Sequence, residues 1–177
     1  MNRRLLLLVP FAGVVAAGAG FFAMLKRETE GKFDPRGVPS MLIGKHVPPF
    51  ALPGDPGFAD TDLAGHPILV NFFASWCVPC VEEAEVLMRL KQAGAPLYGI
   101  AYKDKPDATA GFLAKHGNPY ARIGRDEPGR VAIDWGVTGV PETYLIDKAG
   151  IVRSRWVGPL TAQSVAAEVQ PLLRQYA

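Results

Sequence analysis

The feature that most constrains the fold is a strand-like run that leads directly into a pair of cysteines. Residues 68–74 are almost entirely apolar, which is typical of a strand buried on both faces. Cys77 and Cys80 follow at once, and from Val78 to Ala93 apolar residues recur at helical spacing. The sequence therefore predicts a buried strand that passes into a helix, with both thiols at the junction.

Other periodic segments place this junction in an α/β domain. Their order, β-α-β-α and then β-β-α, predicts a central mixed sheet flanked by helices. The first half of the sheet is expected to be parallel, and the last two strands to form an antiparallel hairpin. Thr161 suits the N-cap of the last helix, which Pro171 should kink or shorten. Beyond the first strand and helix, we expect lead-in strands at 50–52 and 58–61, strands at 97–102, 143–146 and 151–156, and helices at 106–116, 130–135 and from 161 onwards.

The cysteine count and the charge exclude several classes of function. The 177 residues contain only two cysteines, too few for a disulfide scaffold or for a four-cysteine zinc site. The three histidines, His46, His66 and His116, are dispersed and form no ligand pair, so no metal or other cofactor is expected. A net charge of +2 without a stripe of Lys or Arg argues against a nucleic-acid partner.

The N-terminus is typical of a membrane-targeting segment. Residues 5–25 carry no charge, and as a helix they would be about 31 Å long, close to the ~30 Å hydrocarbon core of a bilayer. Arg3 and Arg4 would hold the N-terminus in the cytoplasm. A cleaved signal peptide ending near residues 17–19 is the alternative, and both interpretations export the domain. We expect a single-pass inner-membrane signal-anchor at residues 1–25, a linker at 26–40 and the folded domain at 41–177.

The spacing of Cys77 and Cys80 suits thiol–disulfide exchange. At a helix start, residues three apart lie one turn apart, so the two sulfurs can bond. Cys77 would cap the helix, where free N–H groups and the helix dipole stabilise a thiolate, while Cys80 could attack a mixed disulfide formed by Cys77. Pro79 is tolerated in the first turn, and Trp76 would cover one side of the site. Half of a zinc site and a passive disulfide are the alternatives, but neither accounts for the strand that feeds directly into the motif.

A second motif precedes a later strand. In Gly139-Val140-Pro141-Glu142-Thr143 a proline stands just before an apolar strand, a position that often marks a cis peptide bond. A trans proline at the start of an edge strand is the alternative.

At this spacing, residues 76–80 and Val140-Pro141 together resemble the thioredoxin superfamily. The resemblance implies that Pro141 is cis and faces the disulfide, and that Val140 offers its backbone to an incoming peptide. A closer resemblance, to the CcmG/DsbE branch, covers residues 39–176. It is carried by residues 42–45, 48–52, 102–104, 117–120 and 136–143. Members of that branch are membrane-anchored periplasmic proteins of cytochrome c maturation.

The resemblance to the CcmG/DsbE branch implies a substrate, partners and two acidic residues. It implies reduction of the disulfide in the haem-attachment motif of apocytochrome c, near the haem-ligation machinery. A membrane dithiol donor of the DsbD or CcdA type would then re-reduce the cysteine pair. Glu83 and Glu142 occupy the positions of the family's acidic residues, and Glu83 would exchange a proton with Cys80 from inside the domain.

Two further hypotheses remain open: a protein that transfers electrons in the opposite direction, and one that transfers none. A general exported oxidase would use the same cysteine pair to introduce disulfides, although Pro79 stands where thioredoxin, a reductant, also has a proline. A non-enzymatic module would use the fold and the Val140-Pro141 edge to hold extended peptides.

Overall fold

The computed structural model describes residues 8–29 and 40–177. The chain separates into two units, Met1–Pro39 and Ser40–Ala177. The first unit contains the helix α2 (Leu8–Thr29). Among the residues that the structure describes, no helix is both long enough and apolar enough to cross a membrane. Parts of the expected anchor and linker, residues 1–7 and 30–39, lie outside the described residues.

A five-stranded sheet with the order β5-β4-β3-β6-β7 forms the centre of the second unit. The pairs β3/β4 and β4/β5 are parallel, whereas β3/β6 and β6/β7 are antiparallel, so the predicted mixed sheet is confirmed. A separate two-stranded ladder joins β1 (Ala51–Leu52) to β2 (Phe58–Ala59). The strands of the main sheet are β3 (Ile68–Phe73), β4 (Leu97–Tyr102), β5 (Arg122–Asp126), β6 (Glu142–Ile146) and β7 (Val152–Val157).

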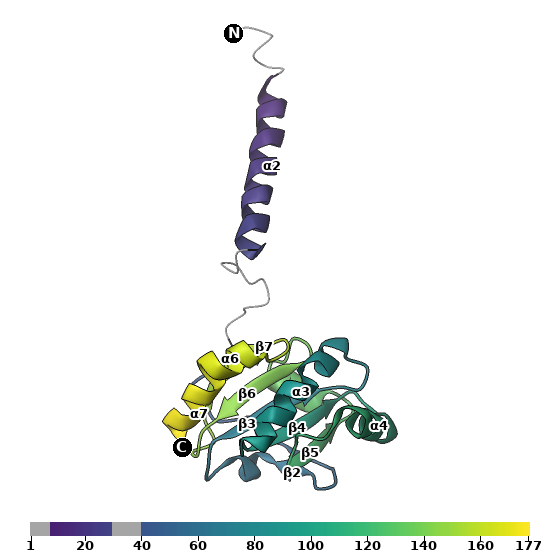
Figure 1. The fold of residues 1–177 in the computed structure, drawn as a ribbon. Helices are drawn as coiled ribbons and strands as arrows, with labels where there is room; N and C mark the ends of the chain where they lie inside the picture. The colour runs from purple at the N-terminus through teal and green to yellow at the C-terminus, as the bar shows by residue number, and fades with distance from the viewer. Residues whose placement is uncertain (1–7, 30–39) are drawn as a thin grey trace. The chain divides into compact units, whose positions relative to one another are not determined.

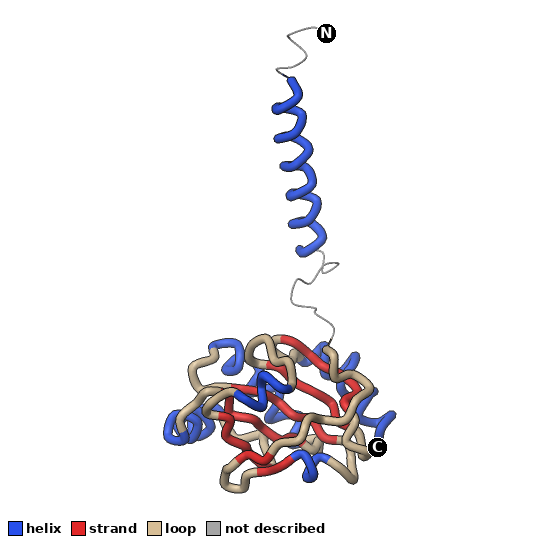
Figure 2. The backbone as a smooth tube through the Cα atoms, turned by 180° about the vertical axis from the view of Figure 1, so that it is seen from behind, coloured by secondary structure: helices blue, strands red, loops and turns tan. Residues whose placement is uncertain are grey.

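The central strand β3 is buried along its whole length because both faces of the sheet are covered. Since side chains alternate along a strand, its odd-numbered residues face one layer and its even-numbered residues face the other. The odd face packs against α3 (Val78–Gln92), α4 (Pro106–His116) and the C-terminal helical segment, and Figure 1 looks onto α3. The even face packs against α5 (Arg130–Asp134) and residues from the 3-10 helix η1 (Asp60–Leu63) and the lead-in segment, on the side seen in Figure 2.

Strand β5 was not predicted from the sequence. It has the sequence Arg-Ile-Gly-Arg-Asp and lies at the edge of the sheet, where only β4 pairs with it in the main ladder. An edge strand needs less apolar surface than a central one, so the alternation that marks a buried strand is weak here.

The C-terminal helix begins where expected but is interrupted in an unexpected way. Thr161 caps α6 (Ala162–Ser164), its hydroxyl accepting the Ser164 N–H at 3.0 Å. A π-helical turn, η2 (Val165–Val169), then leads into α7 (Gln170–Tyr176). The wider turn precedes Pro171, which has no N–H to donate and would clash with a carbonyl of a regular helix. The predicted interruption therefore takes the form of a change in hydrogen-bond register.

Candidate active site

The two cysteines form a disulfide at the start of α3, with their Cα atoms 5.3 Å apart. Cys77 is the N-cap, and its sulfur accepts the Cys80 N–H at 3.2 Å. The first N–H groups of a helix have no partner within the helix, so this position stabilises negative charge on the Cys77 sulfur after reduction. Cys77 is 4% exposed and Cys80 is 2% exposed, so their positions distinguish them more than their accessibility does.

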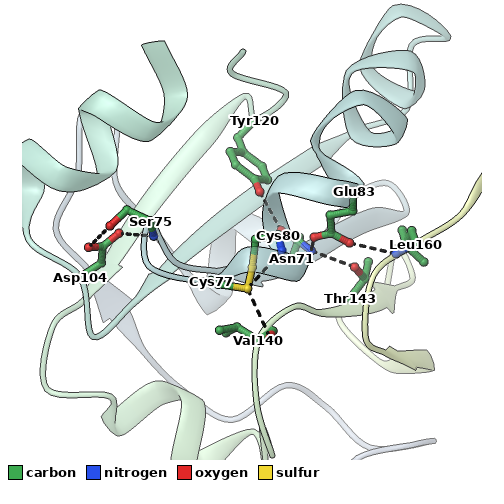
Figure 3. The surroundings of a disulfide bond; sticks show 10 residues. All are labelled: Asn71, Ser75, Cys77, Cys80, Glu83, Asp104, Tyr120, Val140, Thr143 and Leu160. Atoms are coloured by element: carbon green, nitrogen blue, oxygen red, sulfur yellow. Dashed lines mark hydrogen bonds between the residues drawn. A yellow bond between two sulfur atoms is a disulfide. The ribbon is translucent and has the colours of Figure 1, made fainter. Parts of the chain in front are cut away.

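The loop before β6 faces the disulfide, as Figure 3 shows. The Val140–Pro141 peptide bond is cis, which confirms the expected geometry. The Val140 carbonyl oxygen lies 3.4 Å from the Cys77 sulfur. Because a disulfide sulfur carries no hydrogen, this approach is a contact in the oxidised form. The backbone of Val140 is thus close to the Cys77 sulfur, where it could align an extended peptide.

Apolar side chains on the surface border the disulfide. Trp76 is 57% exposed, and its indole N–H donates to the Lys103 carbonyl at 3.3 Å. Its ring also contacts the ring of Tyr102, with centroids 6.3 Å apart. Val78, between the cysteines, is also exposed. A partner peptide would therefore meet an apolar border beside the reactive sulfur.

A buried aspartate that the sequence reasoning missed fixes the loop before the cysteines. Asp104 accepts the N–H of Ser75 at 2.8 Å and the Ser75 hydroxyl, also at 2.8 Å. It also accepts the hydroxyl of Thr109 in α4 at 2.9 Å. Asp104 thereby ties the chain two residues before Cys77 to the start of α4. Only the family resemblance pointed to this segment.

Glu83 lies one turn beyond Cys80 on the buried side of α3 and is 1% exposed. Its Oε1 accepts from Asn71 Nδ2 at 2.9 Å, and its Oε2 accepts the Leu160 N–H at 3.0 Å (Figure 3). Burial raises the pKa of Glu83 from an ordinary 4.5 to about 7, although the bonds from Leu160 and Asn71 oppose the rise. A carboxyl with this pKa can take up and return a proton at neutral pH.

Asn71 connects Glu83 to the rest of the sheet. It is buried at an odd position of β3, directly opposite Thr143 of β6, whose hydroxyl accepts from Asn71 Nδ2 at 3.0 Å. The Tyr120 hydroxyl donates to Asn71 Oδ1 at 2.7 Å. Sequence reasoning missed this residue, although a polar side chain in the middle of an apolar strand was an available signal.

Glu142 is fully buried but lies on the opposite, even face of the sheet. Arg155 binds both of its oxygens at 2.9 Å. The N–H and hydroxyl of Thr138 donate to it at 2.8 and 2.7 Å, and Tyr144 donates at 2.9 Å. Burial alone would raise the pKa of Glu142, but the bonds from these partners outweigh it and hold that pKa below its ordinary value. Glu142 therefore fixes the loop that leads to Val140.

The structure brings together six of the residues proposed from the sequence and separates one from them. Cys77 and Cys80 form the disulfide, Trp76 directly precedes Cys77, and the Val140–Pro141 bond lies at the Cys77 sulfur. Glu83 is buried one turn beyond Cys80 on α3. Glu142 lies on the other face of the sheet and bonds to Thr138 and Gly139 of the loop before Val140. Within the described ranges, no cluster of three or more His, Cys, Asp or Glu residues is placed to bind a metal. The arrangement supplies a sulfur at a helix start, a second sulfur one turn later and a buried titratable carboxyl one turn further along the same helix.

Known proteins resemble this chain in sequence and in structure. Residues 43–155 match the AhpC/TSA family. The thiol:disulfide interchange protein HelX of Rhodobacter capsulatus is 44% identical over 170 residues, which span 94% of this chain and 92% of HelX. The thiol:disulfide interchange protein DsbE of Escherichia coli K12 is 38% identical over 179 residues, 98% of this chain and 96% of DsbE.

A solved structure extends the comparison to three dimensions. The crystal structure of a thiol:disulfide interchange protein DsbE from Chlorobium tepidum superposes with a TM-score of 0.60 at 30% sequence identity. The superposition covers 73% of this chain and 95% of the other.

Proposed function

The chain belongs to the DsbE and HelX family of thiol:disulfide interchange proteins, with their thioredoxin-like fold, and on this premise we propose that it reduces the disulfide of apocytochrome c. The substrate would be the Cys-x-x-Cys-His motif, whose two thiols must be free before haem is attached. The observation that carries the proposal is the position of the Cys77 sulfur, at the start of α3 and 3.4 Å from the Val140 carbonyl. There a thiolate is stabilised next to backbone that can hold a peptide.

The reaction starts from the reduced pair. The Cys77 thiolate attacks one sulfur of the substrate disulfide; a new S–S bond forms, and the other substrate sulfur leaves as a thiolate. Cys80 then gives up its proton and attacks the Cys77 sulfur. This step forms the Cys77–Cys80 disulfide and releases the second substrate thiolate, so two electrons have passed to the substrate.

The buried residues have separate roles in this scheme. Glu83, with its pKa raised to about 7 by burial, takes the proton of Cys80 as that thiol attacks. Glu142 acts as a positioning residue: through Thr138 it holds the loop that presents the Val140 carbonyl. Trp76 and Pro141 complete the surface that the peptide contacts.

The proposal also includes attachment of the chain to the inner membrane and a membrane protein that supplies its electrons. The uncharged residues 5–25 would anchor the chain in the inner membrane, with residues 41–177 in the periplasm. Since that compartment is oxidising, the pair needs a reductant after each turnover, and a membrane dithiol donor of the DsbD or CcdA type would supply it. Alkaline extraction of membranes tests the attachment: the anchored chain stays in the pellet, whereas a chain cleaved near residues 17–19 is released.

The direction of transfer can be tested with one peptide in two redox states. Reduced protein is mixed with an oxidised Cys-x-x-Cys-His peptide, and separately oxidised protein with the reduced peptide. We expect net reduction of the peptide in the first mixture and little oxidation in the second. Net oxidation of the peptide, or a redox potential near the −120 mV or so of DsbA, would assign the protein to the exported oxidases instead.

A control separates enzymatic reduction from simple peptide binding. Cys77→Ala should bind the oxidised peptide but leave its disulfide intact. If this variant still supports cytochrome c maturation in cells, the non-enzymatic binding module is the correct interpretation.

A further inference from the structure

The side-chain amide of Asn71 has a fixed direction, and that direction depends on Tyr120. A carboxylate can only accept hydrogen bonds, so Asn71 must turn its NH2 group towards Glu83 and its oxygen away. The oxygen then needs a donor, because an unpaired buried carbonyl is costly. The Tyr120 hydroxyl is that donor, at 2.7 Å. Burial, and secondarily the charge of Glu83, raise the pKa of Tyr120 well above its ordinary value, so the hydroxyl keeps its hydrogen.

The fold makes room for Tyr120 at this place. Its ring stacks on Phe73 of β3, with centroids 4.7 Å apart. Gly99 of β4 lies opposite Asn71 in the parallel ladder, and a Cβ at Gly99 would come within 2.8 Å of the Tyr120 ring. A larger residue at position 99 would therefore displace the ring that carries the donor to Asn71.

Few of the groups that surround Glu83 can exchange a proton with it. Its two hydrogen-bond donors, Asn71 and the Leu160 N–H, are neutral amides that hold their hydrogens. Thr143 contacts Asn71 and does not titrate at accessible pH. Of the three residues that bond to the side chains of Glu83 or Asn71 besides each other, Leu160, Thr143 and Tyr120, only Tyr120 has a titratable side chain. The Cys80 thiol lies one turn before Glu83 on the buried side of α3. Tyr120 reaches Asn71 and makes no bond to the carboxyl itself.

From this arrangement we propose that Asn71, oriented by Tyr120, is a positioning residue. By donating a hydrogen bond to Glu83 without exchanging a proton with it, Asn71 leaves Cys80 as the group with which Glu83 exchanges its proton. The inference rests on the proposed function, because it deepens the role given there to Glu83. In the resolving step the proton leaves the Cys80 sulfur for a Glu83 oxygen, and in the reverse step it returns. The two neutral amides hold the carboxyl in place without offering it another acceptor.

Two substitutions change the proton balance without removing Glu83. Asn71→Asp replaces the donor to Glu83 with a second acceptor of similar size, so the two carboxyls must share a proton. Tyr120→Phe keeps the stacked ring and removes only the hydroxyl, so the amide can turn its oxygen towards a protonated Glu83. Tyr98→Phe, on a half-buried tyrosine that contacts Phe58, is the matched control.

The test measures the same proton in two ways on the full-length chain. Carboxyl ¹³C NMR follows the titration of Glu83 in the oxidised protein. Stopped-flow kinetics follow the release of a Cys-x-x-Cys-His peptide from Cys77 by Cys80 as a function of pH. We expect the Glu83 midpoint and the kinetic midpoint to rise together, by about one pH unit or more in Asn71→Asp and by less in Tyr120→Phe. Tyr98→Phe should match the wild type.

Glu83→Gln serves as the reference that separates the role of Asn71 from the role of Glu83 itself. If Glu83→Gln changes the kinetic pH profile while Asn71→Asp and Tyr120→Phe match the wild type, the role of Asn71 is wrong and that of Glu83 stands. If Glu83→Gln itself leaves the profile unchanged, the proposed proton transfer fails and the inference fails with it. Should Asn71→Asp not fold, Tyr120→Phe decides the question alone.

Discussion

Glu83 and Glu142 are both buried and belong to the same folded unit, yet the structure shifts their pKa values in opposite directions. Glu83 lies on the face covered by α3, where its hydrogen-bond partners are neutral amides, and burial raises its pKa to about 7. Glu142 lies on the other face, and Arg155 binds both of its oxygens. Burial acts on Glu142 in the same direction, but the bonds from Arg155, Thr138 and Tyr144 together outweigh it and lower the pKa.

The comparison shows that burial alone does not fix the direction in which the pKa of a carboxyl shifts. What decides is the set of hydrogen-bond donors: Glu142 accepts from Arg155 and also from Thr138 and Tyr144, whereas Glu83 accepts from two neutral amides. A carboxylate held by a guanidinium stays ionised and serves as a rigid anchor for a loop. A carboxyl that receives only neutral donors stays close to its titration point at neutral pH, where it can transfer protons.

The largest expected effect comes from removing the positive charge of Arg155, which binds Glu142 and has no counterpart at Glu83. Arg155→Met leaves Glu142 buried without a counter-charge, and we expect a loss of about 3–5 kcal/mol in the free energy of unfolding at pH 7. The loss should shrink at acid pH, where protonation of Glu142 removes the unpaired charge. Urea-induced unfolding of the variant and the wild type at several pH values measures both quantities.

A surface ion pair provides the control for that loss. Arg89 pairs with Glu85 at 3.5 Å on an exposed part of α3. Arg89→Met should therefore change the free energy of unfolding by less than about 1 kcal/mol. If Arg155→Met costs no more than Arg89→Met, the ion pair does not account for the difference between the two glutamates.

The next effect concerns the pH dependence of stability through Glu83. Its folded pKa, about 7, lies above the ordinary 4.5 expected after unfolding. Between these values the folded chain binds the extra proton, so this contribution is complete below pH 4.5 and is lost as pH rises through 7. The loss amounts to about 3 kcal/mol. Glu83→Gln should remove this slope from a plot of unfolding free energy against pH.

Glu82→Gln, on the exposed neighbour of Glu83, is the matched control and should keep the wild-type slope. Glu142 contributes with the opposite sign: its lowered pKa stabilises the fold above the ordinary value, and this contribution disappears as pH falls through the folded pKa. If the plots of unfolding free energy against pH for Glu83→Gln and the wild type run parallel between pH 4.5 and 8, the pKa of Glu83 is not raised in the folded protein.

The smallest effect tests the loop that Glu142 anchors. Thr138→Val removes the hydroxyl that donates to Glu142 at 2.7 Å, and we expect a loss of about 1 kcal/mol in stability. The looser loop should also slow peptide reduction several-fold, since Val140 is then held less firmly. Thr138→Ser keeps the hydroxyl and should restore both. A rate unchanged in Thr138→Val would separate Glu142 from the positioning of Val140.

The sequence was sufficient for the features that depend on local pattern. The continuous apolar run of β3 and the helical spacing after Cys77 predicted the junction that carries the disulfide. Glu83 came from its place in a motif, and its burial followed from lying one turn beyond Cys80. The resemblance to a family supplied the cis geometry of Pro141.

Features that depend on register between distant segments could not be predicted. Arg155 meets Glu142 because β6 and β7 pair with Glu142 opposite Val157, a register that the hairpin sequence does not specify. Tyr120 reaches Asn71 only because β4 places Gly99 beside β3. The family motif placed Glu142 near the disulfide, whereas the alternation along β6 turns its side chain to the other face.

The most direct test of the account is to trap the attacking sulfur with single-cysteine variants. Cys80→Ser and Cys77→Ser are each incubated with an oxidised Cys-x-x-Cys-His peptide, and the adducts are identified by mass spectrometry. The account predicts a stable mixed disulfide at Cys77 in the first variant and little or none at Cys80 in the second. An adduct that forms equally well or better at Cys80 would contradict the assignment of the helix-start sulfur as the nucleophile.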